Sequence, residues 1–247
     1  MKKIKVGAVS YLNTKPLLYG IEHSEELMQQ IELITDYPSK IAKQLLDGDI
    51  DIGLVPVAII PQMQEYYIVS DYCIGAENNV ASVCLFSDVA LNEAEKILLD
   101  YQSKTSVALC KVLLKNHWKK NIVLEDAKQD FTEDIKGKVA GVLIGDRALQ
   151  QRKKSKYIYD LADEWKAMTG LPFVFAAWIS NKKLPNDFIQ LFNQKNSEGV
   201  NNIDAVLKEN ECSYYDLQTY YTKNISYTLT AEKLKGMNLF LELMQQL

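Results

Sequence analysis

The first quarter of the chain alternates short β-branched runs with one amphipathic stretch. Residues 3–9, 31–34 and 50–55 are rich in Val and Ile and are bounded by polar residues, which predicts strands. The segment between the last two starts with Pro38, places apolar side chains at helical spacing and ends at Gly48, so it predicts a helix. A strand, a helix and a strand in this order form a βαβ unit, which requires a parallel sheet covered by helices.

The remainder of the chain continues this mixture and contains no internal repeat or low-complexity linker. Its predicted strands are short apolar runs at residues 78–87, 97–99, 121–124, 138–145 and 171–180. Its predicted helices have apolar positions at helical spacing and lie at residues 103–118, at 157–170 and from Leu184 to the end.

These elements predict an α/β protein of two lobes, the second inserted into the first. Lobe I takes residues 1–87 and 178–247, and lobe II takes residues 88–177. The crossings near Ser87 and Trp178 fall in apolar, strand-like segments, as expected for two hinge strands. A cleft between the lobes is then the expected ligand site. A single doubly wound sheet is the alternative that the pattern leaves open.

Charge and composition narrow the classes of partner. The chain has 28 basic and 32 acidic residues, a formal net charge of −4, and no continuous basic track for a nucleic acid. The longest apolar stretches are about half of the ~20 residues that a membrane helix needs, and they contain proline. The start of the chain lacks the apolar core of a signal peptide. We therefore expect a cytoplasmic monomer or homodimer without nucleic-acid or membrane partners.

The residues that usually hold metals or act as bases are scarce and scattered. No CxxC pair occurs, and the four cysteines lie far apart, which favours reduced, packed thiols at Cys73, Cys84, Cys110 and Cys212. The two histidines, His23 and His117, lie in polar stretches. No Ser-His-Asp order, phosphate-binding glycine loop or HExxH motif is present. The residues therefore argue against a zinc site or a redox centre, and they do not support a hydrolase, a nucleotide-dependent enzyme or a metalloprotease.

Polar side chains follow the first predicted strand, at Ser10, Tyr11, Asn13 and Thr14, immediately before Pro16. The carboxyl end of a parallel strand is the usual place for a ligand, and Pro16 suits the first turn of a helix. The free amides of such a helix start favour an anion. The alternative is that Asn13 and Thr14 only cap the helix.

A second helix start of this kind follows Ser103, Thr105 and Ser106. Hydroxyls and free amides at a helix N-terminus suit a carboxylate or a phosphate, although capping alone explains such a motif equally well. Two anion-suited helix starts, one in each predicted lobe, indicate a small ligand with two anionic groups held across a cleft.

Other polar groups lie in apolar strands or at their ends. If its strand is buried, the Ser82 hydroxyl needs a partner from the backbone or from a ligand. Gly145 and Asp146 end another strand, where Asp146 is the predicted N-cap, and Arg147 could reach a carboxylate or remain solvated. An aromatic row predicts core, with a cleft wall as the alternative, at Phe173, Phe175 and Trp178.

Four of these stretches together resemble one known family. The motifs are VSYLNTKPL, SKTSVALCKVLL, LIGDRAL and YDLADEWKAMTGLPFVFAAW, which occur in the expected order between Val9 and Trp178. They resemble the chorismate dehydratases of the futalosine route to menaquinone. The combination of SYLN with TGLPFVFAxW is specific. The related 1,4-dihydroxy-6-naphthoate synthases share the fold but open with a different motif.

The resemblance implies a fold like the type II periplasmic binding proteins, no cofactor and no metal. It implies conversion of chorismate, a dicarboxylate, to 3-[(1-carboxyvinyl)oxy]benzoate plus water. It places catalysis at Asn13 and Ser82 and substrate binding at Ser10, Thr105 and Ser106. The strand-end positions described above add three further substrate-binding residues, which are Tyr11, Gly145 and Asp146.

With so few conventional bases, we hypothesise that the substrate's own side-chain carboxylate removes the ring proton. Asn13 and Ser82 would position that carboxylate or the departing hydroxyl, and Asp146 is the rival base. Two alternatives to this function are a non-catalytic small-anion-binding or sensor protein on the same fold and the naphthoate synthase.

Overall fold

The βαβ unit expected near the start of the chain is present in the computed structural model, which describes residues 3–128 and 131–247. Strand β1 (Ile4–Val9) pairs in parallel with β2 (Ile31–Asp36) on one side and with β3 (Ile52–Pro56) on the other. Helix α3 (Pro38–Asp47) connects β2 to β3 and ends at Gly48, as the sequence indicates. The polar residues that follow β1 therefore lie at the carboxyl edge of a parallel sheet.

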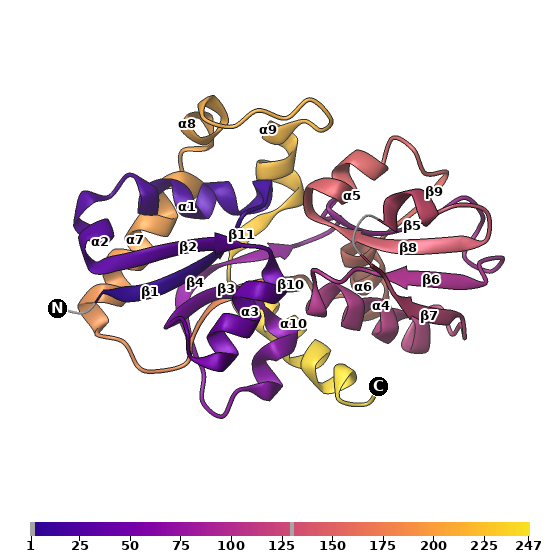
Figure 1. The fold of residues 1–247 in the computed structure, drawn as a ribbon, viewed down its shortest axis with the longest axis horizontal. Helices are drawn as coiled ribbons and strands as arrows, with labels where there is room; N and C mark the ends of the chain where they lie inside the picture. The colour runs from indigo at the N-terminus through magenta and orange to yellow at the C-terminus, as the bar shows by residue number, and fades with distance from the viewer. Residues whose placement is uncertain (1–2, 129–130) are drawn as a thin grey trace.

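Three antiparallel strands complete the first sheet, whose strand order is β11-β4-β10-β3-β1-β2. They are β4 (Tyr67–Ala76), β10 (Phe173–Ser180) and β11 (Ser226–Thr228). Helices α1 (Lys15–Glu22) and α7 (Asn186–Val200) pack against each other on this part of the molecule (Figure 1). We call the structure built on this six-stranded sheet the first lobe.

The second sheet has the strand order β7-β6-β8-β5-β9 and carries its own helices. Its strands are β5 (Val83–Ser87), β6 (Lys96–Leu99), β7 (Val123–Asp126), β8 (Val139–Ile144) and β9 (Tyr157–Asp160). Its helices are α4 (Lys104–Asn116), α5 (Gly145–Gln151) and α6 (Leu161–Thr169). We call this part the second lobe. The two sheets lie side by side in Figure 1.

The two points at which the chain passes between the lobes differ from the predicted ones at Ser87 and Trp178. Ser87 ends β5 in the second sheet, and Trp178 lies within β10 in the first sheet. The chain therefore leaves the first lobe in the segment 77–82 and returns in the segment 170–172. Both strands are buried along their whole length. For this reason their hydrophobic pattern could not show which sheet each one joins.

Two short edge strands replace predicted helix. Residues 157–160 form β9 and pair with β5. Helix α6 begins only after this strand, because Asp160 is its N-cap and the Asp160 carboxylate accepts a hydrogen bond from the Ala162 amide. Strand β11 interrupts the C-terminal region that the sequence predicts as helical throughout. Each is held by pairing with a strand far away in the sequence, which local spacing does not show.

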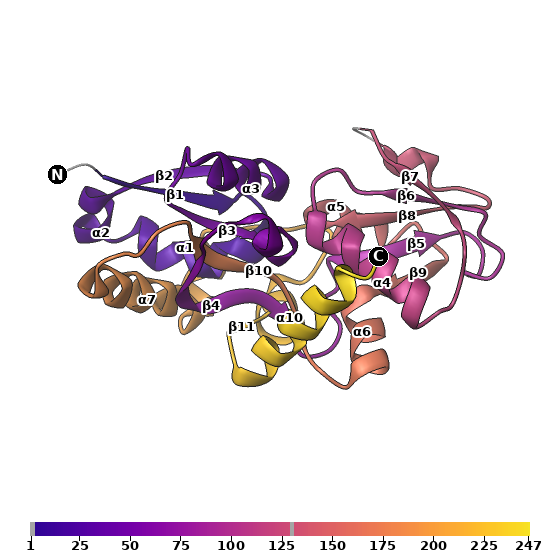
Figure 2. The same ribbon diagram turned by 90° about the horizontal axis from the view of Figure 1, so that it is seen from below.

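The C-terminal helix α10 (Ala231–Met244) packs against both lobes, because it contacts β10 of the first and α4 of the second. Figure 2 shows it passing beneath β10 toward α4. The ring centroid of Trp165, in the second lobe, lies 5.2 Å from that of Phe173 and 6.1 Å from that of Phe240. The apolar core is consequently continuous across the lobe boundary.

A buried lysine secures the start of α10. The Lys233 side chain is fully buried, and its ammonium donates to the Ser226 carbonyl and hydroxyl at 2.6 and 2.7 Å and to the Thr228 carbonyl at 2.7 Å. Removal from water lowers the pKa of Lys233. The ammonium thus joins the start of α10 to β11, a short edge strand whose register with β4 has only two residue pairs.

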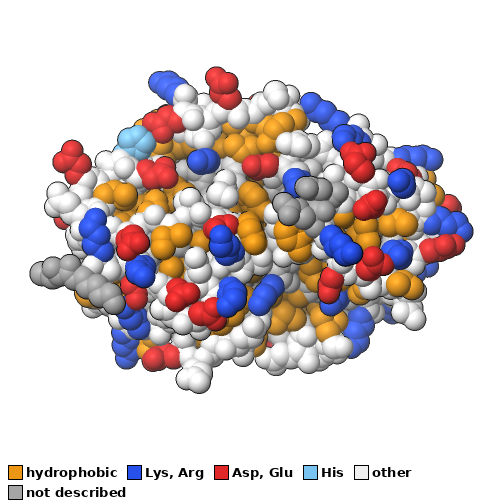
Figure 3. Space-filling view, in the orientation of Figure 1, with side chains coloured by type: hydrophobic (Ala, Val, Ile, Leu, Met, Phe, Trp, Pro, Cys, Tyr) orange, Lys and Arg blue, Asp and Glu red, His pale blue; other side chains and the backbone are white. Residues whose placement is uncertain are grey.

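The surface of the face shown in Figure 3 carries basic and acidic side chains interspersed, without a continuous basic track. In the part of the chain that the structure describes, every helix is too short or too polar to cross a lipid bilayer.

Only one thiol of the native protein is expected to react rapidly with a soluble thiol reagent. Cys73, Cys84 and Cys110 are buried, and burial raises the pKa of Cys73 to about 11 and that of Cys110 to about 12. Cys212 is partly exposed. Titration with a disulfide reagent should therefore count one fast thiol in buffer and four in denaturant. A second fast thiol in buffer would contradict the packing described above.

Candidate functional site

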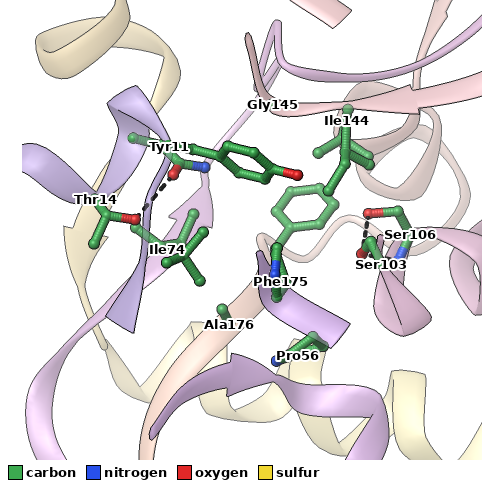
Figure 4. A pocket seen from close by; sticks show the side chains of 14 residues that line it. Tyr11, Thr14, Pro56, Ile74, Ser103, Ser106, Ile144, Gly145, Phe175 and Ala176 are labelled. Atoms are coloured by element: carbon green, nitrogen blue, oxygen red, sulfur yellow. Dashed lines mark hydrogen bonds between the residues drawn. The ribbon is translucent and has the colours of Figure 1, made fainter. Parts of the chain in front are cut away.

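A pocket of about 410 Å³, part of it open to solvent, lies between the two lobes. The first lobe contributes Val9, Tyr11, Asn13, Thr14, Pro38, Pro56, Ile74, Phe175 and Ala176. The second lobe contributes Val83, Ser103, Ser106, Ile144 and Gly145. Figure 4 shows Tyr11 and Phe175 between the two walls, with the serine pair on the second-lobe side. The mainly apolar lining with a few polar groups is typical of a site for a small organic ligand.

The turn after β1 presents Asn13 without using it as a helix cap. Thr14 occupies the N-cap position of α1, yet neither Thr14 nor Asn13 caps the helix with its side chain. The buried Thr14 hydroxyl instead donates to the Asn13 carboxamide oxygen at 3.2 Å (Figure 4). This bond fixes the orientation of the Asn13 carboxamide and leaves its amide nitrogen as the donor available to a ligand.

The start of α4 supplies the polar groups of the opposite wall. Ser103 is the N-cap, and its hydroxyl accepts a hydrogen bond from the Ser106 amide at 3.2 Å. The two hydroxyl oxygens are 2.9 Å apart, so they form a pair that lines the pocket. Capping and pocket lining therefore occur together here, and the free amides of the first turn add a preference for an anion.

Ser10 and Thr105, both predicted to bind substrate, lie outside the pocket lining. Ser10 is exposed and lies outside the lining, and its amide donates to the Asp36 carbonyl. Thr105 is fully buried, and its hydroxyl accepts from the Ala58 amide at 3.1 Å. Thr105 thus connects α4 to the first lobe and is not part of the pocket lining.

Ser82 lies at the point where the chain enters the second lobe. The Asp160 carboxylate accepts from the amides of Val80 and Ala81 at 3.1 and 2.7 Å, and Ala81 has a φ of 63°. The Gly145 amide donates to the Ser82 carbonyl at 2.8 Å. The Ser82 hydroxyl is buried and has no hydrogen-bond partner of normal geometry in the protein. Ser82 lies outside the pocket lining, and the side chain beside its hydroxyl is that of Tyr220.

The lobes meet across the mouth of the pocket. The Tyr11 hydroxyl donates to the Gln102 carboxamide oxygen, which also accepts from Arg147 at 2.7 Å. Arg147 is held by the buried Asp100 carboxylate at 2.8 Å, so its predicted carboxylate partner is one of the protein's own. Burial is the main cause of the raised pKa of Tyr11. The described structure is therefore a closed form of the cleft.

Asp146 contributes to the same closure and is not the N-cap that the sequence predicts. The N-cap of α5 is Ile144, because the backbone already turns at Gly145, and Asp146 lies in the first helical turn. Its carboxylate accepts from the Leu12 amide of the first lobe at 3.3 Å, and burial raises its pKa. Asp146 lies outside the pocket lining.

Gly145 is expected to tolerate no side chain in this closed form. Its φ is +61°, and a Cβ would lie 2.9 Å from the Tyr11 ring. Gly137 has a similar φ of +58° but nothing within 4 Å of such a Cβ, so Gly137→Ala is a matched control for backbone strain alone. We expect Gly145→Ala to cost about 1–3 kcal/mol more than the control, which is roughly 2–10 °C in Tm.

Thermal unfolding of both glycine variants, with and without Tyr11→Ala in the same chain, measures this contact. The difference between them should shrink when the Tyr11 ring is removed. Equal Tm values for the two alanine variants would show that Tyr11 does not press on Gly145.

The lining residues of the described structure include no Asp, Glu, His, Lys or Arg. The histidines lie elsewhere and pair with carboxylates, His23 with Glu209 at 3.2 Å and His117 with Glu164 at 3.0 Å. The pocket therefore offers neutral donors from Asn13, Ser103 and Ser106 and no conventional base among its described lining groups.

The structure brings together Tyr11, Asn13, Ser106 and Gly145 from the predicted set. It adds Thr14 and Ser103, which the sequence names only as capping or accompanying residues, and Phe175, for which a cleft wall is the alternative to core. The signal for Thr14 and Ser103 was their position at a strand end or helix start beside other polar residues, and the signal for Phe175 was the aromatic row.

Comparison with known proteins gives consistent matches over most of the chain. A family model described as menaquinone biosynthesis matches residues 4–246. A chorismate dehydratase of Thermus thermophilus is 25% identical over 226 residues, which cover 83% of this chain and 81% of that protein. A chorismate dehydratase of Campylobacter jejuni is 31% identical over 193 residues, which cover 75% and 72%.

Solved structures show the same fold at low identity. A protein from Archaeoglobus fulgidus has a TM-score of 0.77 and 13% identity over 99% of this chain and 98% of that chain. A Candida albicans gene product with the generic periplasmic binding protein fold has a TM-score of 0.68 and 11% identity over 100% and 91%. The fold is therefore like that of the periplasmic binding proteins, as the sequence predicts.

Proposed function

Since the chain belongs to the menaquinone biosynthesis family, we propose that it is a chorismate dehydratase, which converts chorismate to 3-[(1-carboxyvinyl)oxy]benzoate and water. The observation that carries the proposal is the neutral pocket between the lobes. Its polar groups are an asparagine on one wall and a serine pair at the start of α4 on the other. This arrangement suits a small dicarboxylate held from both sides.

The reaction removes one ring proton and one hydroxyl from neighbouring carbons. The C–H bond breaks at the carbon that bears the enolpyruvyl ether, its electron pair forms the new ring double bond, and the hydroxyl leaves with the proton as water. The product ring is aromatic, so the overall change is downhill. The protein then has three tasks, which are to orient the ring, to stabilise the charge that develops and to assist one proton transfer.

The substrate's own side-chain carboxylate is the proposed base. The described lining groups include no ionisable side chain except Tyr11, whose phenol is protonated because burial raises its pKa. The carboxylate of the enolpyruvyl ether group can reach the proton on the ring carbon that bears this ether. Asn13 and Ser82 are proposed to hold that carboxylate or the departing hydroxyl with neutral hydrogen bonds.

Neutral donors suit this role better than fixed charges. A lysine or arginine at each contact would stabilise the bound substrate as strongly as the transition state, and would lower KM without raising kcat. Asp146 is the rival base, since burial raises its pKa and it lies beside Gly145. In the closed form its carboxylate is bound to the Leu12 amide.

The experiment that tests the function is incubation of the purified protein with chorismate, followed by ultraviolet absorbance and mass spectrometry. Loss of one water together with an aromatic spectrum supports the dehydratase. Tight binding without turnover would indicate a small-anion-binding or sensor protein instead. Activity only on the substrate of the naphthoate synthase would assign that enzyme, and neither binding nor turnover of chorismate would overturn the proposal.

A further inference from the structure

A segment from the C-terminal part of the chain lies against both residues to which we assign catalysis. It consists of α9 (Leu217–Thr219) and a π-helical turn at Tyr220–Asn224, followed by β11. In Figure 1, α9 lies above the boundary between the lobes, near α5. Single π-helical turns are rare, and they occur often at functional sites.

Two hydrogen bonds anchor this segment to the site. The Asn224 carboxamide donates to the Asn79 carbonyl at 3.4 Å, at the start of the loop that leads to Ser82. The Tyr227 hydroxyl donates to the Asn13 carbonyl at 3.0 Å. The segment is thus hydrogen-bonded both to the loop that leads to Ser82 and to the turn that contains Asn13.

Within the segment, the Tyr220 side chain is fully buried and its hydroxyl faces the Ser82 hydroxyl. Neither oxygen makes a hydrogen bond of normal geometry within the described protein. Buried hydroxyls are nearly always hydrogen-bonded, so two that face each other without partners form an incomplete polar site. A third group with an acceptor oxygen would complete it.

The donors of this pair can be arranged in only a few ways. If the Tyr220 hydroxyl donates to the Ser82 oxygen, the Ser82 proton is directed away from Tyr220 and toward a ligand. Burial keeps the phenol protonated by raising its pKa, so it remains a donor at neutral pH. The Ser82 hydroxyl is then fixed as a donor to a carboxylate or hydroxyl oxygen.

We propose that Tyr220 is a positioning residue, whose hydroxyl orients the Ser82 hydroxyl toward an oxygen of the dicarboxylate substrate. The inference rests on the proposed function, and it adds a residue outside the motifs that suggested that function. It also gives the π-helical turn a role, which is to place the Tyr220 oxygen at the entrance of the second lobe.

The ring and the hydroxyl of Tyr220 can be tested separately. The ring packs edge-on against Tyr215, with centroids 5.9 Å apart, whereas the hydroxyl has no partner that the fold requires. Tyr220→Phe therefore keeps the packing and removes only the oxygen. Tyr221→Phe is the matched control, because Tyr221 is the next residue, is also buried and also has an unpartnered hydroxyl, but the groups around that hydroxyl are Asp146, Cys212 and Tyr214 and do not include Ser82.

Steady-state turnover of chorismate should show a split between kcat and KM. We expect Tyr220→Phe to lower kcat by about tenfold or more and to change KM by less than about threefold, because a misdirected donor weakens transition-state stabilisation. Tyr221→Phe should leave both constants close to those of the unaltered protein. Both variants should keep the Tm of the unaltered protein within a few degrees.

The double variant decides whether Tyr220 acts through Ser82. If it does, adding Tyr220→Phe to Ser82→Ala should cause no further loss of kcat. A full additional loss in the Ser82→Ala background, or full activity of Tyr220→Phe alone, would overturn the proposal. So would a fall of Tm that accounts for the lost activity.

The unaltered protein is assayed beside the variants, which separates the two levels of the proposal. If it converts chorismate and Tyr220→Phe is equally active, only the positioning role fails. If the unaltered protein does not convert chorismate, the proposed function fails, and with it the positioning role.

Discussion

Asn13→Ala and Ser82→Ala are each expected to lower kcat for chorismate by about 10²-fold, with a smaller change in KM. The Asn13 carboxamide is held in place by the Thr14 hydroxyl at the pocket wall, and the Ser82 hydroxyl is buried and makes no hydrogen bond of normal geometry in the described protein. Loss of one preorganised donor to developing charge costs roughly 10²–10³ in kcat in other enzymes. The effect is measured as steady-state turnover of chorismate. The Tm of each variant is the check on folding.

Two further variants make this result decisive. Ser10→Ala should remain within about twofold of the unaltered protein, because Ser10 is exposed and outside the lining, and hydroxyl loss there removes no pocket contact. Asp146→Asn tests the rival base. If Asp146→Asn abolished turnover without unfolding while Asn13→Ala and Ser82→Ala stayed fully active, the substrate-carboxylate hypothesis would be wrong.

Raising the pH above about 10 is expected to unfold the protein in one cooperative step. Tyr220, Tyr221 and Tyr227 are buried, and desolvation is the main cause of their raised pKa values. A group whose pKa is raised by folding stabilises fully below its unfolded pKa and loses that contribution as the pH rises toward the folded value. Each such tyrosine therefore lowers the free energy of unfolding by up to about 1.4 kcal/mol per pH unit above 10.

Three tyrosines together remove up to about 4 kcal/mol per pH unit, a large part of the stability of an ordinary domain. The effect of Lys233 on stability has the opposite sign, because its pKa is lowered, but Lys233 is one group against three tyrosines. Phenolate absorbance and circular dichroism should be followed together through the alkaline range. The buried phenols should ionise only as secondary structure is lost, and full ionisation of all 14 tyrosines with unchanged dichroism would contradict this prediction.

The sequence predicts well those elements whose signals are local. The β-branched runs of β1 and β3 and the Pro38 to Gly48 helix are unambiguous because their starts and stops are local. In the site, Asn13 and Ser106 were found because polar groups at a strand end and at a helix start are positioned by backbone geometry alone.

The rest depends on contacts between distant parts of the chain. Strands β9 and β11 are held by pairing with β5 and β4, and each is too short for a strand pattern to be recognised in its own sequence. Asp146 is drawn to the Leu12 amide of the other lobe, and Arg147 to the buried Asp100. Tyr220 gave no signal, because a tyrosine in a polar C-terminal stretch becomes interesting only when the fold places it opposite Ser82.

The position of β10 has a consequence for the order of events during synthesis. This strand lies in the middle of the first sheet, between β4 and β3, yet the whole of the second sheet precedes it in the sequence. On the ribosome, the strands of the second lobe can therefore pair while the first sheet is still in two parts, with β1, β2 and β3 separate from β4. The nascent first lobe exposes unpaired apolar edges until residue 180 has emerged, and unpaired edges of this kind make a folding intermediate prone to aggregation.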